Sequence, residues 1–289
     1  MSNMVVNTNI LALNSHRNLS TVGMDQAKAS ARLSSGLRIN SAADDAAGLA
    51  ISEKMRSQIR GLDMATKNTQ DAISMIQTAE GAMQEIENMA QRVRELTVQA
   101  ANDSNEAEDR QKIGAEIKQL TAEIDAMAGR TEFNKKVLAT GSFSSSTQSL
   151  KMQIGANSGQ VISFNIGSLK ASALHASYSD IGDILAAATK TSGTAATISK
   201  VFISIAEAGV TRVTDERAKL GAIQNRLEYT MNSLKISSEN LSASESRIRD
   251  ADMAKEMMRL TRTNILQQAA TSMLAQANQA PQNVLQLLR

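Results

Sequence analysis

An uninterrupted apolar repeat between Gly48 and Ala100 constrains this chain more than any other feature of its sequence. Read at alternating steps of three and four residues, ten of its twelve seam positions are apolar, and no proline interrupts it. The seam consists of Leu62, Ala65, Thr69, Ala72, Ile76, Ala79, Met83, Ile86, Ala90, Val93, Thr97 and Ala100. A 3.5-residue repeat is typical of coiled-coil helices. Because a single helix cannot bury its own seam, other segments of the chain must cover it.

The composition favours long helices and argues against several classes of function. The 289 residues include one proline and no tryptophan, and only 2% are aromatic. The net charge of +2, with acidic and basic residues interspersed, gives no footprint for nucleic acid or an anionic membrane. The absence of cysteine excludes disulfides and zinc–thiolate sites. No apolar run approaches a membrane span, and the N-terminus lacks the pattern of a cleaved signal peptide, so we expect any export to use another route.

The sequence at both ends of the chain predicts helices whose apolar faces no other segment of the same chain can cover. Residues 1–33 and 250–289 carry apolar side chains on more than one helical face, so each needs partners on two sides. Ser41 is expected to cap the long central helix together with Asp44. Pro281 should kink or interrupt the last helix. Since no further segment remains to cover the ends, we infer that assembly buries them and that they are disordered in an isolated monomer.

Two further helices are predicted to cover the central seam. One, over 106–128 with Gly129 as its C-cap, should fold back on 48–100 as an antiparallel hairpin. From about Ala195 a heptad ladder offers a second partner. Its positions are Ala206, Val213, Leu220, Leu227, Leu234, Leu241 and Ile248.

The segment between these helices has a different character. Alternating residues at 150–154 and 161–166 predict two short strands, the only β-like material expected, and 181–188 predicts a short helical turn. The predicted fold class is therefore mainly α, with long antiparallel coiled-coil-like helices and one small β-hairpin region.

Six strings of this sequence resemble the bacterial flagellin family. They are LSSGLRINSAADDAAGLAISEKM (33–55), QRVRELTVQAAND (91–103), EIDAMAGRTEFN (123–134), LGAIQNRL (220–227), SRIRDADMAKE (246–256) and ANQAPQNVLQLLR (277–289). They fall in the family's order, and the resemblance covers about 1–170 and 195–289. Residues 168–194 carry no family pattern that we place.

The resemblance implies a fold in which the N- and C-terminal helices pair. Residues 1–40 and 250–289 would form a terminal filament-core domain with its connector, and 41–249 a helical bundle domain with a β-hairpin region at about 140–170. With no room for the large outer domains of longer flagellins, the chain resembles a minimal form. The implied function is a structural subunit that self-assembles into the extracellular flagellar filament for motility, after export by the flagellar type III apparatus.

The resemblance also implies partners. They are other flagellin subunits, hook-associated and filament cap proteins, an export chaperone and toll-like receptor 5. The residues that we expect to mediate self-assembly or chaperone binding are Ile10, Leu13, Leu19, Leu260, Leu266, Leu274, Leu285, Leu287 and Leu288.

A receptor-binding surface is implied around the string QRVREL. Gln91, Arg92, Leu96 and Glu116 resemble the family surface that binds toll-like receptor 5. Without the resemblance, the same residues describe a solvated helix face with ordinary ion pairs.

Nothing in the sequence indicates an enzyme, a cofactor or a metal site. His16 and His175 are isolated from any carboxylate-rich or second-histidine spacing. Asp44 and Asp45 are better explained by helix capping than by metal binding. The main alternative is a hook–filament junction protein, which shares the helical ends; a helical signalling or translocator protein and an enzyme are weaker alternatives.

Overall fold

The computed structural model describes residues 9–102, 104–144, 148–174, 178, 181 and 195–287. In its last two helices, side chains are described from Val201 and up to Gln279. Long helices dominate, which confirms the mainly α fold class. Contacts divide the chain into two compact units: Met1–Ile59 with Glu239–Arg289 (unit 1), and Arg60–Ser238 (unit 2).

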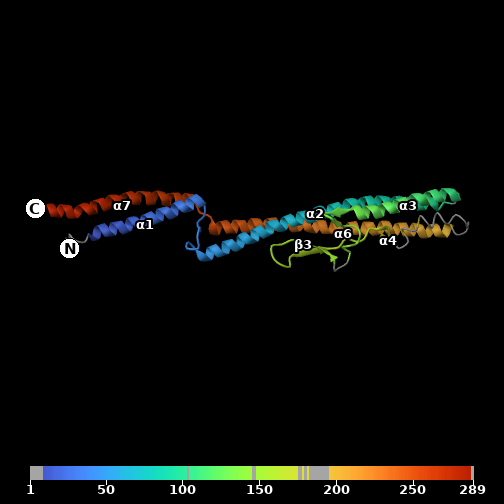
Figure 1. Ribbon diagram of the computed structural model, residues 1–289, viewed down its shortest axis with the longest axis horizontal. Helices are drawn as coiled ribbons and strands as arrows, with labels where there is room; N and C mark the ends of the chain where they lie inside the picture. The colour runs from blue at the N-terminus through green and yellow to red at the C-terminus, as the bar shows by residue number, and fades with distance from the viewer. Residues whose placement is uncertain are drawn as a thin grey trace. The chain divides into compact units, whose positions relative to one another are not determined.

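Unit 1 is built on a pair of helices from opposite ends of the chain. Helix α1 (Ile10–Ser35) lies beside α7 (Met253–Leu287), as Figure 1 shows, and this confirms the expected pairing of the N- and C-terminal helices. The start of α2 (Ala46–Ala100) and the end of α6 (Ala195–Arg249) complete the unit. There Glu53 of α2 accepts a hydrogen bond of 2.5 Å from Arg249 of α6.

The connector after α1 starts at a glycine for a conformational reason. Gly36 has φ of 72°, the left-handed region, and its N–H donates to the carbonyl of Arg32 at 2.8 Å, which ends the helix. The connector then pairs with the link between α6 and α7. The N–H of Arg38 donates to the carbonyl of Arg249 at 2.7 Å, and that of Ala251 donates to the carbonyl of Gly36 at 2.9 Å.

The predicted N-cap of the long helix is wrong by four residues. Helix α2 begins at Ala46, and Asp45 caps it by accepting the N–H of Gly48 at 2.9 Å. Ser41 instead closes a separate turn, in which its N–H and hydroxyl both donate to Asp44 at 3.2 Å. Lys28 of α1 also binds the Asp44 carboxylate, and this contact stabilises the turn.

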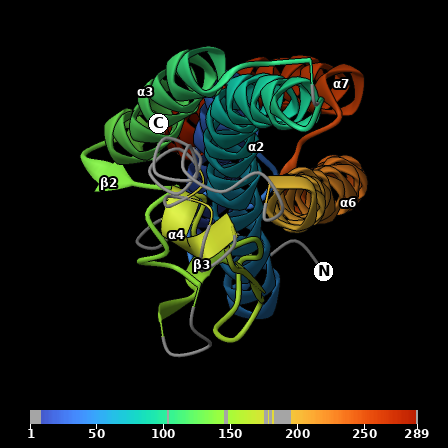
Figure 2. The ribbon, with the colours of Figure 1, turned by 90° about the vertical axis from the view of Figure 1, so that its right-hand side faces the viewer.

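Unit 2 is a bundle of α2, α3 (Ala107–Arg130) and α6, which Figure 2 shows running alongside one another. Every predicted seam position of α2 is buried except Leu62, which is half-buried. Within this unit, Ala206, Val213, Leu220, Leu227 and Leu234 of α6 are also buried. Sequence periodicity therefore predicted the core of the bundle correctly.

Helix α3 ends two residues later than predicted. Gly129 is helical and has no positive φ, so it is not the C-cap. The cap is Thr131, whose N–H (3.0 Å) and hydroxyl (2.7 Å) both donate to the carbonyl of Met127. Thr131 has an extended backbone, and the chain leaves it directly into a strand.

The described part of unit 2 contains two antiparallel hairpins where one was predicted. Strands β3 (Leu150–Gln153) and β4 (Val161–Phe164) confirm the prediction and are slightly shorter. Strands β1 (Glu132–Phe133) and β2 (Lys136–Val137) were missed, so the prediction of a single β region is wrong. Their turn uses Asn134 and Lys135 at positive φ, and strands of two residues carry no detectable alternation. The single turn of α4 (Ala171–Leu174) was also missed.

Helix α7 continues through Pro281 to Leu287, so the proline does not interrupt the helix, and the alternative of a kink stays a prediction. Helix α6 begins at Ala195, where the ladder was expected to return. The predicted helical turn at 181–188 lies outside the described residues, apart from Ile181, which is fully buried.

Candidate functional site

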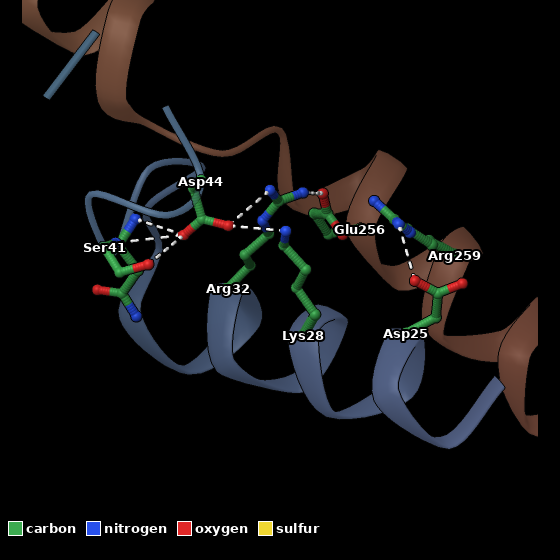
Figure 3. A network of polar contacts seen from close by, with 8 residues as sticks. Asp25, Lys28, Arg32, Ser41, Asp44, Glu256 and Arg259 are labelled. Atoms are coloured by element: carbon green, nitrogen blue, oxygen red, sulfur yellow. Dashed lines mark hydrogen bonds and ion pairs between the residues drawn. The ribbon is translucent and has the colours of Figure 1, made fainter. Parts of the chain in front are cut away.

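Helices α1 and α7, the terminal pair, are antiparallel, and polar contacts join them near both ends of α1. The contacts run from Asn9 with the carbonyl of Ala277 (2.7 Å), through Gln26 with Asn264 (2.6 Å) and Asp25 with Arg259 (3.6 Å), to Arg32 with Glu256 (3.3 Å). Figure 3 shows two of these contacts, that of Asp25 with Arg259 and that of Arg32 with Glu256, and the Asn9 contact lies at the other end of α1.

Asp44 is the centre of the polar network shown in Figure 3. Its carboxylate lies 2.8 Å from Lys28 and 3.5 Å from Arg32, and Arg32 reaches on to Glu256 of α7 at 3.3 Å. The hydrogen bond from Lys28 holds the pKa of Asp44 well below its ordinary value, although partial burial opposes this, and the N–H of Ser41 reinforces it. The network therefore ties the connector to both helices of the terminal pair.

The terminal pair leaves much of its apolar surface uncovered. Within α1, Ala29 is the only described residue that is fully buried. The exposed large apolar residues of the pair are Ile10, Leu11, Leu13, Met24, Met253, Met257, Met258, Ile265, Leu266 and Met273. An exposed apolar surface along two whole helices is typical of a protein–protein interface.

The predicted self-assembly residues fall into three groups. Ile10, Leu13 and Leu266 are exposed, at 56%, 62% and 42%. Leu19, Leu260 and Leu274 are half-buried. The side chains of Leu285, Leu287 and Leu288 lie outside the described residues.

None of the exposed methionines of α7 was among the predicted self-assembly residues, and Asn9 was not singled out either. The type of these methionines does not distinguish a core position from an interface, because their flexible side chains pack in either. The Asn9 contact joins residues 268 positions apart, and no local pattern could have indicated it.

A second polar cluster joins α2 and α3 in unit 2. The Arg92 guanidinium donates to Glu116 of α3 at 3.1 and 3.2 Å and to Glu95 at 3.1 Å. These hydrogen bonds, first that with Glu95 and then that with Glu116, raise the pKa of Arg92. Gln91 is exposed beside them and donates to Glu87 at 3.3 Å. Three of the four predicted receptor-binding residues thus lie on one exposed surface.

Leu96 does not share that surface. Its side chain is 1% exposed and belongs to the core of unit 2, together with Val93 and Ile113. The interpretation of Leu96 as a surface residue is therefore corrected: α2 buries a face wider than the strict seam, and Leu96 lies directly beside the seam position Thr97.

Among the described residues, no group of three or more histidine, aspartate or glutamate side chains is arranged to hold a metal ion. In the same part of the chain, no helix combines the length and apolar character that crossing a membrane requires.

Comparison with known proteins gives the family. The model of the bacterial flagellin N-terminal helical region matches residues 6–144, and that of the C-terminal helical region matches residues 203–288. The chain belongs to the bacterial flagellin family. It is 52% identical to flagellin from Bacillus subtilis (strain 168) and 50% identical to flagellin from Halalkalibacterium halodurans, in each case over 99% of this chain and 100% of the relative.

This flagellin is a structural subunit of the flagellar filament, and the filaments that such flagellins form are extracellular. Its fold also resembles that of a Vibrio parahaemolyticus protein described as a candidate flagellar hook-associated protein. That likeness has a TM-score of 0.62 and covers 72% of this chain and 100% of the other, at 12% identity. An identity that low concerns the fold alone, so the filament subunit is better supported than the hook–filament junction protein.

Proposed function

We propose that residues 1–40 and 250–289 form the domain through which flagellin subunits assemble, and that 41–249, with its β-hairpin region at about 140–170, forms the adjoining domain. This boundary lies in the connectors, whereas the compact units divide within α2 and α6. The observation that carries the proposal is the exposed apolar surface along both helices of the terminal pair. Burying one such leucine or isoleucine fully contributes about 1.5–3 kcal/mol, so several together would drive polymerisation.

Two substitutions test this assembly surface. We expect Leu13→Ser and Leu266→Ser to give folded monomers with unchanged circular dichroism but to raise the critical concentration for polymerisation at least tenfold, since each removes exposed apolar surface. Val98→Ser is the control, because Val98 is 50% exposed on α2 in unit 2. Filaments forming at the wild-type concentration in both terminal variants would contradict the proposal.

The leucines at the extreme end, Leu285, Leu287 and Leu288, are proposed to contact an export chaperone before assembly and the filament core afterwards. Deleting residues 282–289 should leave unit 2 folded, abolish filaments and prevent chaperone binding in a pull-down. Normal filament length from this variant would contradict the assignment. The same proposal includes export through the flagellar type III apparatus and contacts with hook-associated and cap proteins. It also assigns the protein a structural role in which it catalyses no reaction.

A second proposed function is recognition by toll-like receptor 5 at Gln91, Arg92 and Glu116. The supporting observation is that Arg92 is held on the surface by carboxylates from two helices, which presents an ordered charged group. Arg92→Ala should lower receptor signalling without unfolding the protein, because exposed ion pairs contribute little to stability. Arg130→Ala is the control, since Arg130 is an exposed arginine paired with Glu123 on α3. Equal receptor signalling by Arg92→Ala and Arg130→Ala would contradict the proposed receptor-binding site.

A further inference from the structure

One carbonyl of α7 has lost its normal partner within the helix. In an α-helix, each N–H donates to the carbonyl four residues earlier. Pro281 lies within α7 and has no N–H, so it donates nothing to the carbonyl of Ala277. Pro281 is the only proline in the chain, so it is the only residue in the interior of α7 that lacks a backbone N–H.

The side chain of Asn9 supplies the missing donor from the other end of the chain. Its amide nitrogen donates to the Ala277 carbonyl at 2.7 Å. Its amide oxygen accepts the N–H of Ala12 at 3.0 Å and so caps the first turn of α1. Asn9 and Ala277 are both half-buried. The Asn9 side chain therefore satisfies both a backbone N–H at the start of α1 and the carbonyl that Pro281 leaves without a donor.

The terminal pair needs such a polar contact, because its apolar residues specify the register of α1 on α7 only weakly. Alanines and flexible methionines pack acceptably at more than one position, whereas a single buried asparagine can fix the register of paired helices. A shift of one turn, about 5.4 Å, would bring Asn9 to a carbonyl that already has its helical partner. The contacts of Arg32, Asp25 and Gln26 hold the connector end, and Asn9 holds the other.

We propose that Asn9 is a positioning residue that sets the register of α1 on α7 by recognising the carbonyl freed by Pro281. The inference builds on the proposed role of the terminal pair in assembly: a pair in one register presents one apolar surface to the next subunit. The hydrogen bond is useful only where the proline has removed the helical donor, so the effects of Asn9 and Pro281 must be coupled.

A double-mutant cycle on the full chain tests this coupling. Asn9→Ser keeps the helix cap, because serine caps well, but removes the amide donor. In the wild-type background it should raise the critical concentration for polymerisation roughly fivefold to tenfold, the size expected from an unsatisfied carbonyl. In the Pro281→Ala background, where the introduced alanine would donate within the helix, the same substitution should have less than a twofold effect. Asn14→Ser is the matched control, since Asn14 is exposed on α1 and its side chain bonds Arg17.

Equal losses in the two backgrounds, or none in either, would overturn the inference. A direct measurement covers the case in which the proline variant fails to polymerise. Solid-state NMR of wild-type filaments should show transfer from the Asn9 side-chain nitrogen to the Ala277 carbonyl carbon, and its absence would also overturn the inference. Failure of the proposed assembly surface is separately visible, as normal polymerisation of Leu13→Ser and Leu266→Ser.

Discussion

Asp44 links the connector directly to α1 and, through Arg32, to α7. Lys28 and Arg32 stabilise its charged form, and the connector N–H groups of Asn40 and Ser41 also donate to it, at 3.3 and 3.2 Å. Since the side chain of Asp44 is only 11% exposed, solvent screens these contacts less than those of a surface pair. The geometry of the connector therefore depends on the Asp44 carboxylate.

Substituting Asp44→Asn should loosen the connector and remove part of its acid sensitivity. The folded pKa of Asp44 is lower than the unfolded value of about 3.9. Its charge therefore stabilises unit 1 above that pH, and the contribution is lost as the pH falls toward the folded pKa. At pH 7 the variant should lose about 1.5–3 kcal/mol, the range for hydrogen bonds to charged groups.

Amide exchange at Arg38 and Ala251 measures this effect, because their N–H groups hold the connector to the link between α6 and α7. Protection of both amides should fall in the wild type between pH 5 and pH 2 and vary less in Asp44→Asn. Asp25→Asn is the control, since Asp25 is half exposed and lies 3.6 Å from Arg259. An unchanged pH dependence in Asp44→Asn would show that other carboxylates govern the connector.

At the scale of elements, periodicity predicted the long helices because burial repeats along them. The seam of α2 and the ladder of α6 are each covered by the other helices of the bundle, so their apolar spacing is visible in the sequence. Features that depend on contacts between distant segments were not predictable. Helix α2 begins later than predicted because Lys28 binds Asp44 in the preceding turn. Helix α7 passes through Pro281, and there Asn9 donates to the carbonyl of Ala277.

The candidate sites show the same division. Residue type alone marked the exposed apolar positions at both chain ends, whereas the charged cluster at Arg92 was singled out by the resemblance to the flagellin family. It misplaced Leu96, since a leucine beside a seam fits either a wide buried face or a surface patch. Only the packing of α3 against α2 decides between the two.

The β3–β4 hairpin approaches α2 so closely that a side chain at one glycine of the helix would displace it. A Cβ at Gly61 would lie 2.7 Å from the Cβ of Ala156 in the hairpin turn, whereas one at Gly81 would meet nothing within 4 Å. A second contact is the hydrogen bond of 3.2 Å from Asn68 of α2 to the carbonyl of Gln153. The two glycines of the same helix therefore form a matched pair for a test.

Gly81→Ala should stabilise unit 2 by about 1 kcal/mol, because alanine favours helix over glycine by that amount. Gly61→Ala gains the same propensity but must displace the hairpin, so it should be neutral or destabilising. Denaturant unfolding followed by circular dichroism measures both, and exchange of the β3 and β4 amides should rise only in Gly61→Ala. Equal stabilisation by the two substitutions would show that the hairpin yields without cost.

At the scale of the whole chain, the two units differ in how much they bury by themselves. Unit 2 encloses an apolar core drawn from three helices and a hairpin. In unit 1, the described apolar side chains that are fully buried are Ala29 and Ile39. A helix pair with so small a core is marginal in water, because most helical stability in proteins comes from tertiary packing.

The terminal pair should therefore open easily in a dilute monomer and become rigid in the filament. In the monomer, amides of 10–35 and 253–287 should exchange with opening free energies of about 0–2 kcal/mol, the range of locally unstable segments. Amides of α2 in the buried seam of unit 2 serve as the internal reference and should require about 5 kcal/mol or more. Polymerisation should bring the terminal amides to at least the level of that reference, because neighbouring subunits would cover Leu13, Leu266 and the exposed methionines. Strong protection of both terminal helices before polymerisation would mean that the pair is stable alone, and that assembly joins preformed surfaces instead of ordering them.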